Sequence, residues 1–427
     1  MQKVAIITSK QDIDWVSCKS ISANLLESYT LALNSQCQLF YINGKDTTYS
    51  HWRVASDVRA WGAEKLIFID HAPCPANFIN ILHSLDPYYR PNLIVHVYGD
   101  FILKANDWIA AEAPLAELSI HWICASKKQA ALLKKFVSEE NSKIDICPFP
   151  VSTKEYYFEK NLRVNFRKKL ALVEDDQVFL YTGRLSLQKN IMALIRAFNF
   201  YQKNINPNAV LLMAGPIDDL GMPYLGKTSP EGLMAYDIQT LINALFSTER
   251  RDRIQYLGNF NSQTLNSIYN AADLFISLST HNDEDFGMAP AEALLTGLPC
   301  VLTDWAGYSG FKDSFPSDIK YIPTQIGDVN TIPDQKLIIS ALVELNITPS
   351  TAQREQIAAI ALQNHSVHAC AKKIKYFLSQ EPTHKFKRFT SVFHSVADVL
   401  SVNPRSPFGN ASAFSNLYRE IYSVYPS

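Results

Sequence analysis

The strongest constraint on the fold is a repeated alternation of short apolar runs with longer amphipathic segments. The short runs are rich in β-branched and aromatic residues, which is typical of buried strands, and the segments between them have helical periodicity. Such β–α–β repetition predicts a parallel sheet covered by helices on both faces. In the first half of the chain the predicted strands span 3–9, 36–42, 65–70, 92–99, 121–126 and 143–149.

A turn-rich stretch at 148–157 interrupts the alternation, which then starts again. The later predicted strands span 177–183, 209–215, 253–258, 273–279 and 298–304. Because 427 residues suffice for two large domains, we expect an α/β protein with two Rossmann-like, doubly wound domains facing a cleft. The predicted limits are 1–160 for the N-terminal domain, 161–380 for the C-terminal domain and 381–427 for a C-terminal extension.

Charge and glycine content restrict the kind of ligand. With 40 Lys and Arg against 41 Asp and Glu, the net charge is -1, so no global field attracts nucleic acid, and an anion must be held by a local site. Only three glycines precede residue 180, whereas ten lie between Gly183 and Gly310. Glycine allows a backbone to approach a ligand closely. We therefore expect the ligand site in the second half.

The cysteines and the C-terminal tail bear on location. The seven cysteines are scattered and form no C-x-x-C pair, a usage typical of a reduced cytoplasmic protein. In the tail, Phe386, Phe389, Phe393 and Val396 have helical spacing beside basic residues 385, 387 and 388. Two interpretations are open: the tail packs on the protein, or 385–400 lies on the inner face of a membrane as a basic amphipathic helix.

The first candidate site motif follows the predicted strand 177–183. Gly183 ends this strand and lets the chain turn, and Arg184 and Lys189 then lie at its carboxyl end. A guanidinium fork and an ammonium group there could together hold a diphosphate. The alternative is a pair of solvated surface charges beside a loop.

The second motif follows the predicted strand 273–279. Glu284 lies in a loop, Gly287 opens a helix, and Glu292 lies in its first turns. The amides of Gly287, Met288 and Ala289 at the helix N-terminus would form an anion site. A carboxylate at 284 suits hydroxyl groups of a sugar attached to that phosphate, and Glu292 suits a ribose diol.

Together these two motifs, G-R-x4-K-N and E-x7-E with an internal F-G-x4-E, resemble the nucleotide-sugar half of GT-B glycosyltransferases, in particular the retaining enzymes of glycosyltransferase family 4. The resemblance covers about residues 167–302. It implies that Arg184 and Lys189 neutralise the donor diphosphate and that Glu284 binds the donor sugar. It further implies a set of substrate-binding residues: Gly183, Phe286, Gly287, Met288 and Ala289 near the phosphates, Glu292 at the ribose, and Gly258, Asn259 and Phe260 against the base.

The N-terminal half departs from that family. Its first loop, 9–20, has no glycine, although the family commonly has a glycine-rich loop there. Asp100, after the predicted strand 92–99, is the candidate for a catalytic contact to acceptor or donor sugar, with a turn-stabilising aspartate as the alternative. His96 is either a core or a catalytic histidine. The resemblance implies that cations and helix dipoles hold the diphosphate in place of a metal, and the acidic string at 281–285 lacks the spacing of a metal site. We therefore expect no metal and no cofactor beyond the nucleotide-sugar substrate.

The predicted function is that of a retaining glycosyltransferase. It would move a hexose-type sugar from a nucleotide-diphosphate donor to a saccharide or lipid-linked hydroxyl, in surface polysaccharide or glycoconjugate synthesis. The alternatives are a sugar-nucleotide 2-epimerase of GT-B fold, a phosphorylase and a non-catalytic nucleotide-sugar binding protein. An NAD-dependent oxidoreductase is disfavoured because no strand precedes a G-x-G-x-x-G motif.

Overall fold

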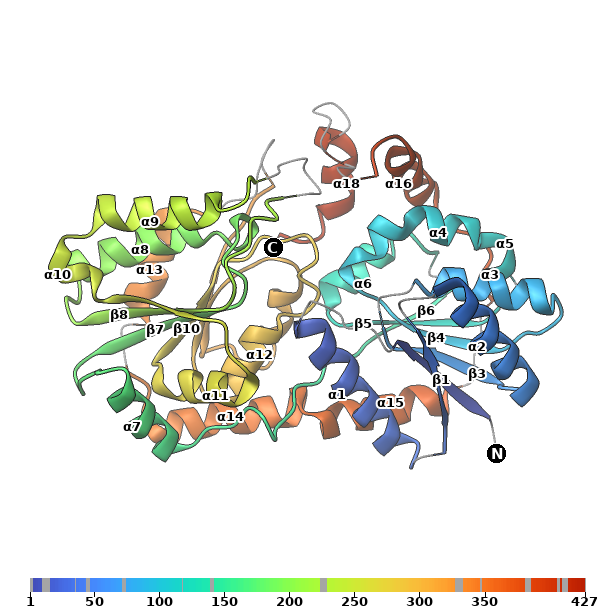
Figure 1. Cartoon of the computed structure of the whole chain (residues 1–427), viewed down its shortest axis with the longest axis horizontal. Coiled ribbons are helices and arrows are strands. Elements are labelled where there is room, and N and C mark those ends of the chain that lie inside the picture. Colours follow the sequence, from blue (N-terminus) through green and yellow to red (C-terminus); the bar gives the residue numbers. More distant parts are fainter. Residues whose placement is uncertain are drawn as a thin grey trace. The chain divides into compact units, whose positions relative to one another are not determined.

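The computed structural model separates the chain into two compact units, shown in Figure 1. Unit 1 comprises residues 1–151 and 365–407, and unit 2 comprises 152–364 and 408–427. The structure describes residues 3–9, 16–34, 36–43, 47–70, 74–116, 118–138, 142–222, 229–326, 333–345, 348–380, 385–404, 408 and 414–426. The residues of the glycine-free first loop from 10 to 15 lie outside this set.

Unit 1 is built on a six-stranded parallel sheet of order β2-β1-β3-β4-β5-β6. Its strands are β1 (Val4–Ser9), β2 (Gln38–Ile42), β3 (Lys65–Phe68), β4 (Asn92–His96), β5 (Ile120–Cys124) and β6 (Lys143–Ile146). Its helices are α1 (Val16–Ala32), α2 (Thr47–Trp61), α3 (Pro75–Leu85), η1 (Gly99–Lys104), α4 (Ala105–Ala110), α5 (Glu112–Leu115), α6 (Lys127–Leu133), α15 (Val367–Ser379) and α16 (Ser391–Val402). Right-handed crossovers place α1, between β1 and β2, on one face and the helices that connect β2 to β6 on the other, while α15 packs beside α1.

Unit 2 repeats this plan with the strand order β12-β11-β10-β7-β8-β9. Its strands are β7 (Gln177–Thr182), β8 (Ala209–Ala214), β9 (Ile254–Gly258), β10 (Leu274–Ser277), β11 (Cys300–Thr303) and β12 (Ile319–Ile322). Its helices are α7 (Lys160–Lys169), η3 (Leu187–Lys189), α8 (Ile191–Asn204), α9 (Leu233–Leu245), α10 (Thr248–Arg251), α11 (Ser262–Ala271), α12 (Met288–Leu295), η5 (Ala306–Phe311), α13 (Gln335–Glu344), α14 (Thr351–His365), η6 (Phe414–Tyr418) and α18 (Arg419–Tyr422).

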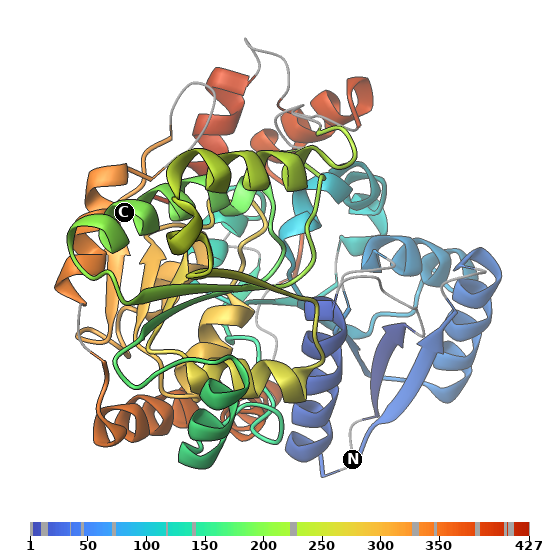
Figure 2. The same ribbon diagram turned by 60° about the vertical axis from the view of Figure 1, so that its left-hand side comes forward.

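Two helical layers cover this second sheet. In Figures 1 and 2, α8, α9 and α13 lie on one face and α7, α11, α12 and α14 on the other. The side chains of α8 that face the sheet, Ile191, Leu194, Ile195 and Phe198, are almost fully buried. Two parallel doubly wound sheets confirm the predicted fold class. The short edge strand β12 was not predicted from the sequence.

The domain limits differ from the predicted ones after residue 364. Helix α15 was expected in the C-terminal domain but belongs to unit 1. Its buried side chains, among them Val367, Cys370 and Ile374, lie on the side that contacts α1. Ser28 of α1 donates a hydrogen bond to the carbonyl of Val367 at 3.1 Å. The helix is amphipathic as predicted, but its apolar face packs against α1 of unit 1 and not on the C-terminal domain.

The first part of the C-terminal extension also packs on unit 1. Phe386, Phe389, Phe393 and Val396 are at most 2% exposed. The Phe393 ring stacks on Phe101 at 5.3 Å. These apolar side chains are therefore covered by protein, as in the first of the two interpretations. Among the described helices, none combines the length and the apolar character needed to cross a bilayer.

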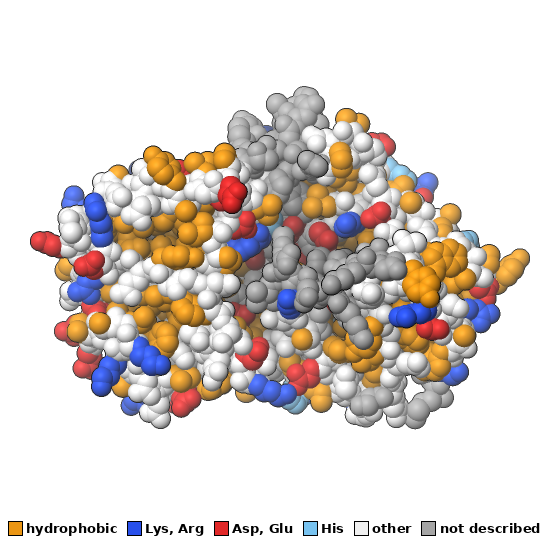
Figure 3. All heavy atoms as spheres, in the orientation of Figure 1, with side chains coloured by type: hydrophobic (Ala, Val, Ile, Leu, Met, Phe, Trp, Pro, Cys, Tyr) orange, Lys and Arg blue, Asp and Glu red, His pale blue; other side chains and the backbone are white. Residues whose placement is uncertain are grey.

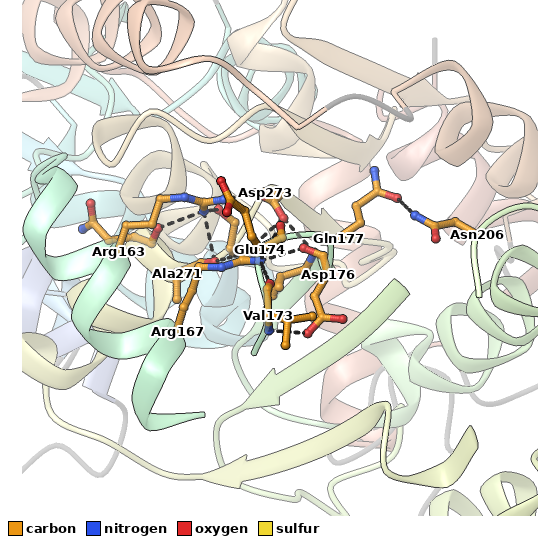
Figure 4. A network of polar contacts seen from close by, with 12 residues as sticks. Arg163, Arg167, Val173, Glu174, Asp176, Gln177, Asn206, Ala271 and Asp273 are labelled. Carbon is orange, nitrogen blue, oxygen red and sulfur yellow. Dashed lines mark hydrogen bonds and ion pairs between the residues drawn. The ribbon is translucent and has the colours of Figure 1, made fainter. Parts of the chain in front are cut away.

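Asp273, at the amino end of β10, joins β10, β7 and α7 (Figure 4). Its Oδ2 accepts the Val178 amide at 2.8 Å, and its own amide donates to the Val178 carbonyl. Arg163 of α7 donates to Oδ1 at 2.5 Å, and Arg167 lies 3.4 Å from Oδ2. Because the carboxylate is buried, the two guanidinium groups compensate its charge.

We expect Asp273→Asn to destabilise unit 2 by about 3–5 kcal/mol, because it leaves two partly buried guanidinium groups without their counter-charge. Asp86→Asn is the matched control, since it removes the partner of Arg59 in an exposed ion pair. Urea unfolding of both variants measures the free energy of unfolding. Similar small losses in the two variants would show that Asp273 does not have this role.

Candidate functional site

The site motifs lie at the point where the strand order of unit 2 reverses. From β7 the chain proceeds outward through β8 to β9 and then returns to the opposite side of β7 to form β10. The loops that leave β7 and β10 therefore diverge from adjacent strands, a position where doubly wound sheets bind ligands. The β7–α8 loop (183–190) and the β10–α12 loop (278–287) carry both predicted motifs.

Gly183 begins the β7–α8 loop with a φ of 126°. Its amide donates to the Ala214 carbonyl at the end of β8. A Cβ on the neighbouring Gly215 would lie 2.1 Å from the Gly183 carbonyl oxygen. The two glycines thus permit a close backbone contact at the carboxyl ends of β7 and β8.

Arg184 follows and is half-buried. Its Nη1 lies 2.6 Å from Oδ2 of Asp218, in the loop after β8. A backbone hydrogen bond from Leu185 to the Pro216 carbonyl holds the two loops together. Asp218 was missed by the sequence analysis, although its position after a predicted strand was a usable signal.

Lys189 and Glu284, predicted from separate motifs, form an ion pair. Nζ of Lys189 lies 2.5 Å from Oε2 of Glu284, and the two side chains are 15% and 11% exposed. The next residue, Asn190, has a left-handed backbone and donates from Nδ2 to the Leu278 carbonyl at 2.7 Å. The Thr280 amide donates to the Gln188 carbonyl. The two loops are thus tied by backbone and side chains.

The β10–α12 loop has a closely packed backbone on one side. The Gly307 amide donates to the Glu284 carbonyl at 2.7 Å. Gly287, with a φ of 102°, has no room for a Cβ, which would lie 2.6 Å from Cε1 of Tyr308. Gly232 also precedes a helix with positive φ, but a Cβ there meets no atom within 4 Å. The requirement for glycine at 287 is therefore steric as well as conformational.

The helix N-terminus and Phe286 have different roles. Met288 begins α12 and is half-buried, as is Ala289. The first amides of a helix lack intrahelical acceptors and favour anions. Phe286, predicted to bind substrate, is 2% exposed and packs on Phe311 with ring centroids 5.0 Å apart. The prediction is corrected for its side chain, which belongs to the core.

Glu292, on α12, is partly exposed and accepts a hydrogen bond from Tyr269 at 2.9 Å. The Tyr269 hydroxyl also lies 2.5 Å from Oγ1 of Thr182 at the end of β7. Desolvation raises the pKa of Glu292 from 4.5 to about 7, against the opposing hydrogen bonds from Tyr269 and Tyr156. The sequence analysis missed both tyrosines because it looked for site residues after the predicted strands. Tyr156 precedes the predicted strand 177–183, and Tyr269 precedes the predicted strand 273–279.

The predicted base-binding turn lies on the same edge of the sheet. Gly258 ends β9 with a φ of 89°, and its carbonyl accepts the Gly215 amide at 2.8 Å. Asn259 is exposed and Phe260 is half-buried. The turn is therefore accessible and adjoins the loop after β8.

His281 is buried close to the two cations. Burial, followed by the charges of Lys189 and Arg184, lowers its pKa well below the ordinary value, so the ring is neutral at physiological pH. Among the described residues, no group of three or more His, Cys, Asp or Glu side chains could hold a metal ion. A metal-free site remains a prediction.

The remaining candidates lie in unit 1. Asp100 is half-buried in η1, directly after β4. His96 is buried and lies 2.8 Å from the Tyr29 hydroxyl, and desolvation lowers its pKa to about 3. These observations favour a core histidine at 96.

Asp70 is a further candidate that was missed. It follows β3, beside the end of β1, where the strand order of unit 1 reverses. Its Oδ2 accepts hydrogen bonds from the Thr8 hydroxyl and the Ser9 amide. Its Oδ1 is buried, and among the residues that the structure describes none donates a hydrogen bond to it. A buried carboxylate oxygen of this kind is suited to a hydroxyl ligand.

Comparisons with known proteins agree with this geometry. The family model described as glycosyl transferases group 1 matches residues 163–312, which include both loops. An uncharacterized glycosyltransferase of Methanocaldococcus jannaschii is 28% identical over 145 residues, which are 34% of this chain and 32% of that relative. The match thus spans about a third of the relative's length. The O-antigen chain mannosyltransferase RfbU of Salmonella typhimurium is 20% identical over 339 residues, 76% of this chain and 83% of that protein.

Among solved structures, Anabaena HepE in complex with UDP and glucose has the same fold. Its TM-score is 0.60 at 15% identity, and the match covers 89% of this chain and 100% of that one. The chain thus has the GT-B fold, and the match of residues 163–312 to a glycosyltransferase family model supports an enzyme of the transferase class. The predicted transferase class and the GT-B resemblance are thus supported, whereas membership of glycosyltransferase family 4 stays a prediction.

The raised pKa of Glu292 predicts a pH-dependent stability. A carboxyl group whose pKa is higher in the folded state than in the unfolded chain stabilises the fold most below about pH 4.5, and this contribution is lost as the pH rises to about 7. Relative to wild type, Glu292→Gln should therefore gain roughly 1–3 kcal/mol across this window. Urea unfolding at several pH values measures it, with Glu249→Gln on exposed α10 as control. Parallel profiles for wild type and Glu292→Gln would contradict the assignment.

Proposed function

We propose that the protein is a retaining glycosyltransferase that transfers a hexose-type sugar from a nucleoside-diphosphate donor to a saccharide or lipid-linked hydroxyl. The observation that carries the proposal is the Lys189–Glu284 pair, in which loops from two adjacent strands bring a cation and a carboxylate within 2.5 Å. A sugar diphosphate requires both kinds of group, a cation for the phosphate and an acceptor for the sugar hydroxyls.

In the proposed reaction, negative charge develops on the diphosphate as the glycosidic bond breaks. Arg184 and Lys189, with the amides at the start of α12, are suited to stabilise this charge. Glu284 accepts hydrogen bonds from the sugar, and Glu292 from the ribose. The base binds against the turn formed by residues 258–260.

Both cations are paired with carboxylates in the structure. Arg184 contacts Asp218 and Lys189 contacts Glu284. A donor can replace the Lys189–Glu284 pair on both sides, because a phosphate binds Lys189 while the sugar hydroxyls bind Glu284. A bare diphosphate separates Lys189 from Glu284 without providing hydroxyl donors. This difference favours the intact donor over its product.

On the acceptor side, we propose that unit 1 binds the hydroxyl nucleophile through Asp100 and Asp70. The departing phosphate takes the proton of that hydroxyl, and attack from the same face preserves the anomeric configuration. A role in surface polysaccharide or glycoconjugate synthesis is supported by the similarity to RfbU, which is named as an O-antigen chain mannosyltransferase. The proposed reaction requires no metal.

Lys189→Ala and Glu284→Ala should each lower turnover at least a hundredfold, because loss of one contact to the transition state costs about 2.7 kcal/mol. Thermal-shift screening against UDP-, GDP- and ADP-sugars identifies the donor, and release of the nucleoside diphosphate measures turnover. Lys203→Ala and Glu249→Ala, at exposed positions of unit 2, are the controls and should retain wild-type rates. Near-normal turnover of the site variants would refute the assignment.

Retention gives a separate prediction that does not require the natural acceptor. With water as acceptor, an α-linked donor should first release the α anomer of the sugar, because attack occurs on the face that the phosphate leaves. NMR of the product before mutarotation distinguishes the anomers. Initial release of the β anomer would contradict same-face attack, and accumulation of an epimerised sugar would identify an epimerase.

A further inference from the structure

The last part of the chain returns to unit 2 after the preceding residues have packed on unit 1. This C-terminal segment (residues 414–426) contains the π-helical turn η6 and the short helix α18. Tyr418, Ile421, Tyr422 and Tyr425 are at most 3% exposed. A short segment that buries so many aromatic side chains is an integrated part of unit 2, held by apolar burial.

The C-terminal segment packs against the β10–α12 loop and the residues that support it. Nδ2 of Asn282 donates a hydrogen bond to the Tyr418 hydroxyl at 2.9 Å. The Tyr425 ring meets Trp305 edge to face, with centroids 5.3 Å apart. The Tyr425 carbonyl accepts the Ala306 amide at 3.3 Å.

These contacts involve residues before and after Glu284 in the sequence. Asn282 is two residues before Glu284 and is buried. Trp305 donates from its indole to the His281 carbonyl at 2.8 Å, and Gly307 donates to the Glu284 carbonyl. The C-terminal segment therefore contacts the loop directly through Tyr418 and indirectly through Trp305.

The tyrosines of the segment also face the acidic side of the loop. The pKa of Tyr422 lies well above its ordinary value, mainly because the ring is buried and also because Tyr425 and Asp283 are close. Tyr422 and Tyr418 have ring centroids 4.6 Å apart. The aromatic cluster thus occupies the side of the loop next to Asp283 and orders Tyr418 against Asn282.

We infer that the C-terminal segment is a positioning element for Glu284 and sets the preference of the site for a nucleotide sugar over the bare nucleoside diphosphate. The inference rests on the proposed function. The contacts of the C-terminal segment reach the Glu284 loop at Asn282 and the 305–306 turn, whereas Arg184 and Lys189 lie on the β7–α8 loop. Disturbing the segment should therefore affect binding of the sugar more than binding of the phosphates.

Tyr418→Phe removes one hydroxyl and keeps the ring. Calorimetric titration should show a roughly 3- to 10-fold weaker affinity for the nucleotide sugar, as expected for one lost hydrogen bond. Affinity for the nucleoside diphosphate of the same base should stay within about twofold. Tyr236→Phe, at a 66% exposed position on α9, is the matched control and should bind both ligands like wild type.

A double-mutant cycle provides a second test. If Tyr418 acts through Asn282, then Asn282→Ala should weaken sugar-nucleotide binding similarly, and the double variant should lose no more than either single one. Equal weakening of both ligands, unchanged sugar-nucleotide affinity or additive losses would each overturn the inference. Failure of wild type to bind any nucleotide sugar would instead refute the proposed function. Circular dichroism melting of each variant confirms that the folded protein is being compared.

Discussion

The parallel pairing of β7 with β10 is the interaction on which the candidate site depends. Leu274 pairs with Phe179 and Phe275 with Leu180, which fixes the register of the two strands. At the amino ends, the buried Asp273 carboxylate accepts the Val178 amide. At the carboxyl ends, the diverging loops bring Lys189 to Glu284. A shift in register at one end would therefore misalign the pair at the other.

Helix α12, which carries Glu292, is also held by a buried charged side chain, which comes from α14. Arg354, on α14, is almost fully buried and donates to the Thr296 carbonyl at 2.9 Å, just after α12. It also donates to the Asn270 and Ala272 carbonyls at the end of α11. A cation at helix C-termini is favoured by the helix dipoles and satisfies carbonyls that have no intrahelical donor. Burial lowers the pKa of Arg354 to about 9.

The charges of the site are arranged locally, as the net charge predicts. On the face drawn in Figure 3, basic and acidic side chains are interspersed, without a large area of one sign. In the proposed function, binding of an anionic donor depends on Arg184, Lys189 and the α12 amides, and the carboxylates beside the cations favour a donor that carries sugar hydroxyls. Asp218 pairs with Arg184 and Glu284 pairs with Lys189, and each pair restricts the orientation of its cation.

The sequence was sufficient to predict the features that follow from local patterns. Short apolar runs identify strands, and Gly183 and Gly287 indicate where the chain leaves two of them. The path of the chain after residue 364 was not predictable, because the apolar face of α15 is the same whichever unit covers it. The start of the last predicted helix was not predictable either. Phe386 and Phe389 have helical spacing in the sequence, but they precede the helix, which begins at Ser391 after the Thr390 cap. Asp218, Tyr269 and Tyr418 have partners far away in sequence, so only the folded structure identifies their contacts.

Hydrogen–deuterium exchange with and without a bound nucleotide sugar tests the central claim most directly, because it locates the ligand without assuming the chemistry. We predict slower amide exchange in the β7–α8 loop (183–190) and from Glu284 into the first turn of α12, with the outer helix α9 unchanged. Protection confined to segments away from the carboxyl ends of β7 and β10 would contradict the account.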